Sequence, residues 1–491
     1  MTMEAGESSG RSVVIVGGGL AGSEAAWQAA AAGAAVTLYE MRPGKMTEAH
    51  CTGLLAELVC SNSLKSEALE NANGLLKHEL AMLGSLLVRA AHEARVPAGS
   101  SLCVDRQRFA AAVTAAVERH PGIRVVREEV RQVPDGVAIV LAPGPLASEA
   151  MAAALESLVG APNLFFYDAV SPIVESDSID MSKVFASSRY GKGEPTYLNL
   201  PLNRDQYEQL VNDLGAARRA PVRDFEDARF FTACMPIEEV AATGRDTLAH
   251  GCLKPVGLAD PRTGRMPHAV VQLRPENLEG TMHSLVGFQT RLAYPEQQRI
   301  FRALPGLEAA RFVRFGSMHR NTYIRGPEVL TAALEHRSRP GVFLAGQITG
   351  AEGYMAAAAT GLVAGINAAR VAAGQGRLVP PPETVVGGLA RYVAQAGAAD
   401  AADFRPMNPN FGLLPPLGGR VRDRRRRNLM LGKRSAEALE AWIADNGLGR
   451  ACGRVSGRAS GEGSGCDCGC ECGGRRAEGR DRTVDHSGVA S

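Results

Sequence analysis

The stretch that decides the fold reads Val13-Val-Ile-Val16, Gly17-Gly-Gly-Leu-Ala-Gly22, Ser23-Glu-Ala-Ala-Trp27 and, after a spacer, Val36-Thr-Leu-Tyr-Glu40. The pattern predicts a buried strand, a G-x-G-x-x-G turn, an alanine-rich helix and a second strand that ends in an acid. Glu40 lies 18 residues after Gly22, which is close to the spacing of a dinucleotide-binding βαβ unit. The order of these parts, more than the glycines alone, predicts a nucleotide site.

Each glycine of this motif has a physical role. Gly17 allows a tight turn, Gly19 lets the backbone approach a pyrophosphate, and Gly22 lets the helix pack closely on the strand. The start of the helix offers free N–H groups and the positive end of its dipole to the phosphates. Glu40 is suited to accept hydrogen bonds from a ribose 2′-OH. The expected cofactor-binding residues here are Gly17, Gly18, Gly19, Leu20, Ala21, Gly22 and Glu40.

Length and composition limit the remaining possibilities. A chain of 491 residues is long enough for two or three domains, and 45% hydrophobic with 22% charged residues is ordinary for a globular protein. The net charge of +2 predicts no general affinity for polyanions, so any nucleic-acid surface must be a local patch. The first ten residues are polar, unlike a secretory signal, and no long uncharged apolar run predicts a membrane span. We expect a cytoplasmic protein with reduced cysteines.

A second glycine-rich entry into a helix occurs far along the chain. Gly341-Val-Phe-Leu-Ala-Gly346 predicts a short buried strand, and the residues after it lead into an alanine-rich helix that reaches about Ala373. An FAD site built from two strand ends needs two such glycine-rich turns. The first turn holds the adenosine and pyrophosphate, and the helix after the second turn directs its positive end at the flavin. We expect Gly346 and Gly350 to contact FAD. The spacing of Gly361 and Gly365 predicts close helix packing.

The fold class predicted from these patterns is α/β. A Rossmann-like FAD-binding domain of the glutathione-reductase type is interrupted by an inserted α+β domain. The expected parts are 12–149 for the first part of the FAD domain, 150–325 for the insertion, 326–445 for its second part with a C-terminal helical segment, and 450–491 for a disordered Gly/Arg/Cys-rich tail. The tail run Cys466-Asp-Cys-Gly-Cys-Glu-Cys472 lacks the spacing of a structural zinc site, so no metal is assigned.

Eleven strings together resemble one family closely. They are Gly17–Trp27, Leu38–Pro43, Ala56–Leu64, Val96–Gly99, Val104–Arg106, Cys234–Glu238, Lys254–Leu258, Met318–Thr322, Gly346-Gln347, Gly353-Tyr354 and Met407–Leu413. The chain resembles the folate- and FAD-dependent tRNA (uracil-5-)-methyltransferases, the TrmFO family, over roughly residues 12–440. It departs from the family at Pro143, where threonine is usual, at Cys51, and in its cysteine-rich tail.

The resemblance implies an activity and its participants. The methylene carbon of methylenetetrahydrofolate goes to C5 of the T-loop uridine at tRNA position 54, giving 5-methyluridine. Reduced FAD supplies the electrons, NADPH or NADH re-reduces the flavin, and no protein partner is required. Two alternatives stay open: another FAD-dependent tRNA uridine-modifying enzyme of the wobble-uridine class, or a non-catalytic protein that binds FAD and RNA.

Two cysteines are candidates for the chemistry. Ser61-Asn-Ser-Leu-Lys65 follows Cys60 and Met235-Pro-Ile-Glu-Glu239 follows Cys234, and both patterns are typical of a helix start, where the dipole favours a thiolate. The alternative for each is a small buried hydrophobe. The resemblance implies that both are catalytic, Cys234 as the nucleophile toward uracil C6 and Cys60 as its acid/base or protecting partner. Cys103 and Cys252 are interpreted as structural.

Two further sequence segments each have two possible interpretations. The run Arg424–Arg427 holds tRNA phosphates or is a solvated face. The string His319-Arg-Asn321 contacts folate or uracil, or it is an ordinary loop.

Overall fold

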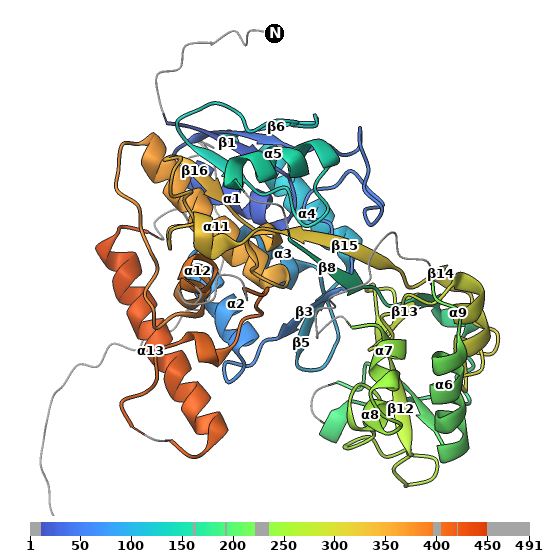
Figure 1. The fold of residues 1–491 in the computed structure, drawn as a ribbon. Coiled ribbons are helices and arrows are strands. Elements are labelled where there is room, and N and C mark those ends of the chain that lie inside the picture. The colour runs from blue at the N-terminus through green and yellow to red at the C-terminus, as the bar shows by residue number, and fades with distance from the viewer. Residues whose placement is uncertain are drawn as a thin grey trace, which may run out of the picture. The chain divides into compact units, whose positions relative to one another are not determined.

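The computed structural model describes residues 11–160, 164–191, 194–220, 235–395, 404–419 and 421–448. Five parallel strands form the sheet that the opening motif predicts, in the order β16-β7-β1-β2-β6 (Figure 1). The edge strand β16 comes from the late glycine-rich segment, so the two predicted halves of the cofactor site meet in one sheet. The strands are β1 Ser12–Val16, β2 Ala35–Tyr39, β6 Ile123–Val126, β7 Ile139–Leu141 and β16 Val342–Leu344.

Side chains alternate between the two faces of this sheet. Val140 and Phe343 point into the core that contains α1 and α11, whereas their neighbours on the same strands point to the opposite face, which α5 covers. Both faces are therefore buried, which accounts for the continuous apolar runs of the strands. The helices around the sheet are α1 Leu20–Ala31, α4 Arg106–Arg119, α5 Glu149–Val159 and α11 Tyr354–Ala372.

Helix α11 is long and apolar enough to cross a membrane by composition alone. In this fold 83% of its most apolar window is buried, mainly against α1, so it is a core helix. Gly361 and Gly365 face α1 at close range: a Cβ atom on Gly361 would lie 2.2 Å from the carbonyl oxygen of Ala21. The predicted close packing at these two glycines is confirmed.

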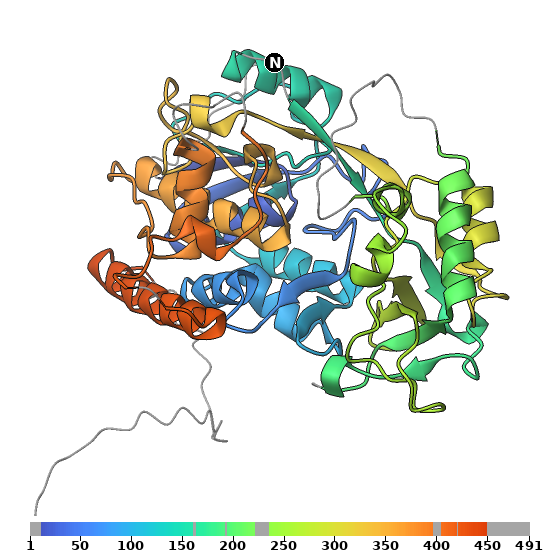
Figure 2. The same cartoon turned by 60° about the horizontal axis from the view of Figure 1, so that its bottom comes forward.

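The inserted segment forms a second, antiparallel sheet with its own hydrophobic core. Its order is β10-β11-β12-β13-β9-β14, and α6, α7 and α9 pack on it (Figure 2). Two antiparallel strands, β8 and β15, carry the chain from the parallel sheet into this region and back. The strands are β8 Leu164–Ala169, β9 Ile173–Glu175, β10 Phe185–Ala186, β11 Leu198–Leu202, β12 Ala269–Pro275, β13 Met282–Leu285, β14 Phe312–Arg314 and β15 Met318–Tyr323. The helices are α6 Arg204–Ala216, α7 Ile237–Ala242, α8 Thr247–His250 and α9 Tyr294–Phe301.

The remaining elements pack around the first core. A small sheet, β3-β5-β4, lies between the glycine motif and the insertion in sequence, and within the described residues α10 precedes α11 while α12 and α13 follow it. These elements are β3 Ser63–Ser66, β4 Arg95–Val96, β5 Ser101–Val104, α2 Ala72–Met82, α3 Leu86–Glu93, α10 Gly326–Val329, α12 Val385–Gln395 and α13 Arg424–Asp445. Short 3₁₀ turns are η1 Ser176–Ser178, η2 Arg189–Gly191, η4 Gln347–Thr349 and η6 Phe411–Leu413.

The α/β fold with an antiparallel insertion is thus confirmed. Residues 1–452 cluster as one compact unit, so the boundaries at 149 and 325 remain our proposal. The predicted tail, 450–491, lies outside the described residues.

Candidate active site

A cleft opens at the carboxyl ends of β1, β2 and β16, where ligands bind in folds of this type. It contains about 1050 Å³ of space that is continuous with solvent. The predicted residues that line it are Gly17, Gly19, Leu20, Ala21, Glu40 and Gly346. Gly18, Gly22 and Gly350 are not among its lining residues and have other positions in the structure.

The turn between β1 and α1 requires its glycines. Gly17 has a φ of +99°, and a Cβ atom there would lie 2.2 Å from the carbonyl oxygen of Ala142, which directly follows the neighbouring strand β7. A Cβ atom on Gly22 would lie 1.7 Å from the Gly17 carbonyl oxygen. The close helix–strand contact predicted for Gly22 is therefore present, and it draws the start of α1 to the floor of the cleft.

Glu40 is buried at the end of β2 and is held by two neighbours. Its carboxylate accepts hydrogen bonds from the Gly18 N–H at 2.8 Å and from the Arg42 Nε–H at 2.9 Å. Burial raises the pKa of Glu40, but the hydrogen bonds and charge of Arg42 outweigh burial, and the net pKa lies below its ordinary value. Glu40 is thus an ionised, fixed acceptor on the cleft wall, and Gly18 positions it.

The residues of this cleft fit a dinucleotide such as FAD. Gly19 and Gly353 are the N-caps of α1 and α11, and both line the cleft. Neither has a side chain to accept the first amides of its helix, so those N–H groups are available to anionic oxygens. Gly350 ends η4 with a φ of +87°, where a Cβ atom would lie 2.4 Å from the ring of Phe404. Gly350 therefore shapes the turn that leads into α11.

A second cleft, here called the chamber, lies between the parallel-sheet region and the inserted sheet. It contains about 1390 Å³ of open space, and its walls include Cys60, Lys65, Arg274 and Asn321. The two clefts adjoin, because Val59, Pro145, Leu146, Gln347, Gly353 and Tyr354 line both of them. A ligand at the start of α11 is therefore exposed to both spaces.

Cys60 lies at this junction in contact with Tyr354. The Cys60 sulfur is 2.9 Å from the Tyr354 phenol oxygen, and the backbone N–H groups of Cys60 and Ser61 donate to the same oxygen at 2.9 and 3.0 Å. A phenol has one proton and two lone pairs. Since both lone pairs are occupied by N–H donors, the phenol proton is donated to the sulfur. This hydrogen bond favours the thiolate of Cys60.

Tyr354 keeps its proton while it makes this contact. Burial, together with the charge of the neighbouring Cys60, raises the pKa of Tyr354 well above its ordinary value. The phenol thus acts as a fixed neutral donor at the N-terminus of α11.

Three arginines fix the loop that carries Cys60. Arg106 donates to the Leu58 carbonyl at 3.2 Å, Arg314 to the Val59 carbonyl at 3.1 Å, and Arg274 to the Ser61 hydroxyl at 3.0 Å. The buried carboxylate of Glu276 accepts from Arg106 at 2.8 Å. Burial opposes ionisation of Glu276, but Arg106 and Arg274 hold its pKa below the ordinary value. The Nε atom of Arg274 has no partner among the described residues, and Arg274 faces the chamber.

The helix predicted directly after Cys60 is wrong. Residues 63–66 form strand β3, which pairs with β5, and the next helix, α2, begins only at Ala72. Ser61 and Ser63 accept hydrogen bonds from the backbone N–H two residues further on, at 3.1 and 3.2 Å. Serine favours such local turns as well as helix caps, and here its side chains make turns that lead into a strand. Cys60 meets the N-terminus of α11 instead.

Cys234 lies outside the described residues. The helical turn predicted after it is confirmed as α7, which begins at Ile237 with Pro236 as its N-cap. Cys103 is fully buried, and burial raises the pKa of Cys252 to about 11, which agrees with a structural interpretation of both. His319–Asn321 belong to β15 rather than to a loop; Asn321 lines the chamber, and the side chains of the other two are not described.

Several residues of the site were not predicted to be functional from the sequence. Tyr354 and Arg106 occur in the strings that carried the family resemblance, but their partners are distant in sequence. Arg274 lies near the end of β12, and a charge in a mostly apolar strand is the local signal that could have marked it.

Comparison with known proteins agrees with this geometry. The model of the family "Glucose inhibited division protein A" matches residues 12–376. A protein of Moorella thermoacetica named methylenetetrahydrofolate–tRNA-(uracil-5-)-methyltransferase TrmFO is 55% identical over 430 residues, which are 88% of this chain and 97% of that protein. A protein of the same name from Aquifex aeolicus is 52% identical over 436 residues, 89% of this chain and 97% of that protein. The structure of Aquifex aeolicus GidA in its form II crystal shares the fold, with a TM-score of 0.64 and 18% identity over 88% of this chain and 73% of that one.

Proposed function

The chain belongs to the glucose inhibited division protein A family and, within it, to the TrmFO branch. On that premise we propose that it methylates C5 of the T-loop uridine at tRNA position 54. Methylenetetrahydrofolate is the carbon donor, FAD the bound cofactor, and NADPH or NADH the reductant that restores it. The tRNA substrate implies a cytoplasmic site of action, and the proposed reaction needs no protein partner.

The observation that supports this function best is the position of Cys60. It faces a chamber large enough for a flipped base beside a folate, and that chamber adjoins the cleft that fits FAD. Its sulfur accepts a hydrogen bond from the protonated Tyr354 phenol, and this hydrogen bond favours the thiolate. A reactive thiol, a dinucleotide cleft and a substrate chamber therefore meet at one helix N-terminus.

The chemistry explains why thiols are needed. Uracil C5 is a poor nucleophile, but addition of a thiolate at C6 converts the ring to an enolate whose C5 attacks a one-carbon electrophile. A base then removes the C5 proton while the bond from the new carbon to the folate nitrogen breaks and tetrahydrofolate leaves. A hydride equivalent reduces the resulting exocyclic methylene to methyl, and the bond to C6 breaks to release the thiolate. We assign the addition to Cys234 and the acid/base or protecting role to Cys60.

The flavin contributes reducing power. When bound, reduced FAD supplies the two electrons that bring the transferred carbon from the methylene to the methyl level. For the protein, we assign Glu40 to the ribose hydroxyls and the starts of α1 and α11 to the anionic and flavin portions. Arg106, Arg274 and Arg314 hold the Cys60 loop in place.

The test uses purified holoenzyme and an unmodified tRNA transcript. Methylenetetrahydrofolate carries a labelled methylene carbon, NADPH is present, and nucleosides are analysed by mass spectrometry. We expect label in 5-methyluridine from position 54, and none when S-adenosylmethionine replaces the folate.

Variants make the test specific. Cys60→Ala and Cys234→Ala should each abolish labelling, whereas Cys51→Ala, a change at an exposed thiol, should keep it. Label confined to the wobble position would support the alternative enzyme class. No label from FAD-loaded protein that binds tRNA would leave only a binding function, and a fully active double cysteine variant would refute the thiol mechanism.

A further inference from the structure

The positive charge of this chain is concentrated in one short segment. Residues 421–434 contain Arg422, Arg424, Arg425, Arg426, Arg427, Lys433 and Arg434 against the single acid Asp423, a formal charge of +6. The whole chain carries +2, so the remainder carries −4. General charge attraction therefore draws a polyanion toward this segment.

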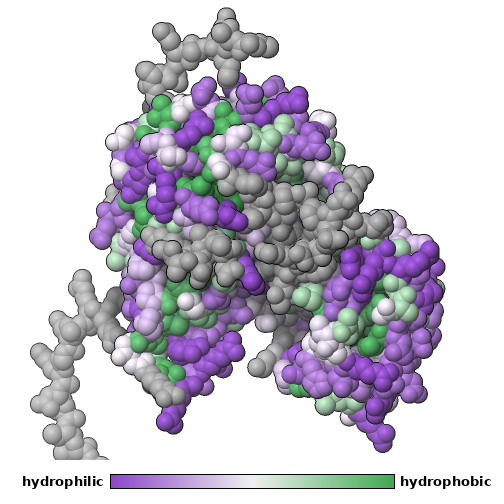
Figure 3. Space-filling model, in the orientation of Figure 1, coloured by the Kyte–Doolittle hydropathy of each residue, from purple (hydrophilic) through white to green (hydrophobic). Residues whose placement is uncertain are grey.

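The segment forms the first turns of α13, where Arg425, Arg426 and Lys433 lie on the side opposite the buried residues. Arg422 and Arg424–Arg427 are exposed, and the side chains of Arg425 and Lys433 are 75% and 80% exposed. The opposite side of the helix is buried through Asn428, Leu431, Gly432, Ser435 and Leu439, at helical spacing. Figure 3 shows hydrophilic side chains over the lower end of α13, where this segment lies.

Helix α13 is firmly attached to an element of the chamber wall. Asn428 donates to the Glu70 carbonyl at 3.0 Å, just before α2, and Ser435 donates to the buried carboxylate of Glu79 on α2 at 2.6 Å. Asn73, in the first turn of α2, lines the chamber. The basic segment and the chamber are therefore positioned by the same helix, and Figure 2 shows α13 and α2 side by side.

The surface chemistry fits a phosphate backbone. A shallow depression is lined by Arg425, Arg426 and Lys433, by the exposed apolar side chains of Leu429 and Met430, and by the helix cap Asp423. Guanidinium groups match phosphate oxygens in a two-point geometry, and apolar side chains pack against sugars and bases. The ion pair of Arg425 with Glu70 is exposed and weak, so a phosphate can replace it.

We propose that the basic face of α13, formed by Arg425, Arg426 and Lys433, binds the phosphate backbone of the tRNA whose uridine enters the chamber. The proposal rests on the proposed function for the identity of the RNA. The face contributes affinity and orientation, and it takes no part in the chemistry at Cys60.

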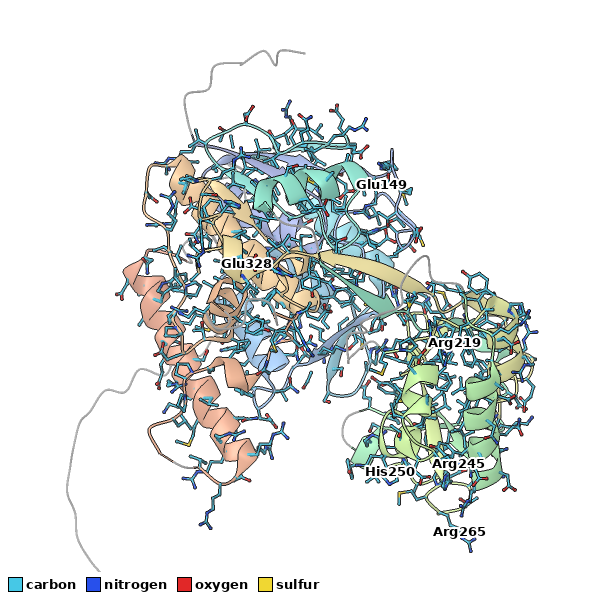
Figure 4. The ribbon with its side chains drawn as sticks, viewed as in Figure 1. Glu149, Arg219, Arg245, His250, Arg265 and Glu328 are labelled. Carbon is cyan, nitrogen blue, oxygen red and sulfur yellow. The ribbon has the colours of Figure 1, made fainter. Side chains whose placement is uncertain are left out.

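The test is a triple substitution, R425Q/R426Q/K433Q, which leaves the helix cap Asp423 and the buried side of α13 intact. The matched control is R204Q/R245Q/R265Q on the insertion, where Arg245 and Arg265 lie far from α13 in Figure 4. Binding of unmodified tRNA transcript is measured by fluorescence anisotropy at several salt concentrations. We expect the α13 variant to raise Kd at least tenfold and to reduce the log–log salt slope by roughly 2–3, at about 0.9 per phosphate contact.

Kinetics separate this proposal from the proposed function. For the α13 variant, KM for tRNA should rise while kcat at saturating tRNA and NADPH oxidation without tRNA stay within twofold. An unchanged Kd and salt slope, or an equal loss in the control, would overturn the α13 proposal, and a protein partner would then be the alternative for this face. If the α13 variant methylates tRNA with an unchanged KM for tRNA, the proposed function stands and the α13 proposal is refuted. If tRNA binding depends on α13 but the wild-type protein methylates no tRNA, the α13 proposal stands and the proposed function is refuted.

Discussion

At the scale of single residues, the contact between Cys60 and Tyr354 concentrates most of the site's chemistry. Two backbone N–H groups donate hydrogen bonds to the phenol oxygen of Tyr354, and the phenol O–H donates one to the sulfur of Cys60. None of these partners is near in sequence, since Cys60 and Tyr354 are separated by 294 positions. The contact exists because the loop after Leu58 reaches the start of α11.

The first prediction concerns Tyr354→Phe. The change removes the donor to the Cys60 sulfur and leaves two backbone N–H groups without their acceptor, so the thiolate is less favoured and the loop is less well held. We expect the pH profile of Cys60 alkylation to move to higher pH, and kcat/KM for tRNA methylation to fall by roughly 10- to 100-fold. Tyr392→Phe, which removes a hydroxyl bound to the Arg405 carbonyl, is the control. An unmoved alkylation profile would show that the phenol does not favour the thiolate.

At the scale of elements, the packing of α11 on α1 determines the shape of the flavin cleft. Gly361 allows the two helices to approach, and a Cβ atom there would overlap the backbone of Ala21, which lines the cleft. We predict that Gly361→Ala lowers the free energy of unfolding by about 1–3 kcal/mol and lowers FAD occupancy. Gly376→Ala is the control, because a Cβ atom at Gly376 meets no atom within 4 Å. Denaturant unfolding and the flavin absorbance per protein measure the two effects; unchanged values in Gly361→Ala would contradict the close approach.

The inserted sheet contains a buried histidine that makes its stability depend on pH. Ser176 donates its proton to the Gly280 carbonyl at 2.6 Å, so its oxygen accepts from His283 Nδ1–H at 2.7 Å. Burial lowers the pKa of His283 to about 4, against 6.5 when exposed. Between these values the unfolded chain binds more protons, so stability is lost as the pH falls from 6.5 toward 4.

We therefore predict a loss of about 2 kcal/mol from this group between pH 7 and pH 5. His283→Asn keeps a donor near the same position without titrating, so its unfolding free energy should fall by that much less over the same interval. The exposed His250, labelled in Figure 4, is the control, and His250→Asn should retain the wild-type dependence. Denaturant titrations at the two pH values measure the difference; parallel curves for His283→Asn and wild type would contradict it.

The elements also show how far the sequence could be interpreted. The glycine turn, the alternating strands and the late helix were predictable, because their signals are local: spacing of glycines, apolar runs and alanine-rich periodicity. The strand after Cys60 was not, since serine and asparagine favour both helix caps and local turns, and pairing with β5 decides between them. Likewise, the arginines that hold the Cys60 loop come from α4, β12 and β14, which only the tertiary fold brings together.

At the scale of the described molecule, three surfaces converge on one reaction. The parallel sheet supplies a cleft suited to FAD, the inserted sheet supplies the far wall of the chamber, and α13 supplies a basic face joined to that chamber through α2. The phosphate backbone of tRNA therefore binds at α13, outside the site around Cys60 where the reaction takes place. Salt is therefore expected to affect tRNA binding more strongly than the reactions of the small-molecule substrates.

The central claim is that methylation of the tRNA uridine proceeds through a thiolate adduct at C6. The most direct measurement is covalent trapping with a tRNA that carries 5-fluorouridine at position 54, followed by intact mass and peptide mapping. The fluorine at C5 cannot leave as a proton does, so the thioether at C6 persists. We predict one protein–tRNA adduct, which maps to Cys234 and is lost in Cys234→Ala. No adduct with active holoenzyme, or an adduct at an exposed thiol such as Cys51, would contradict it.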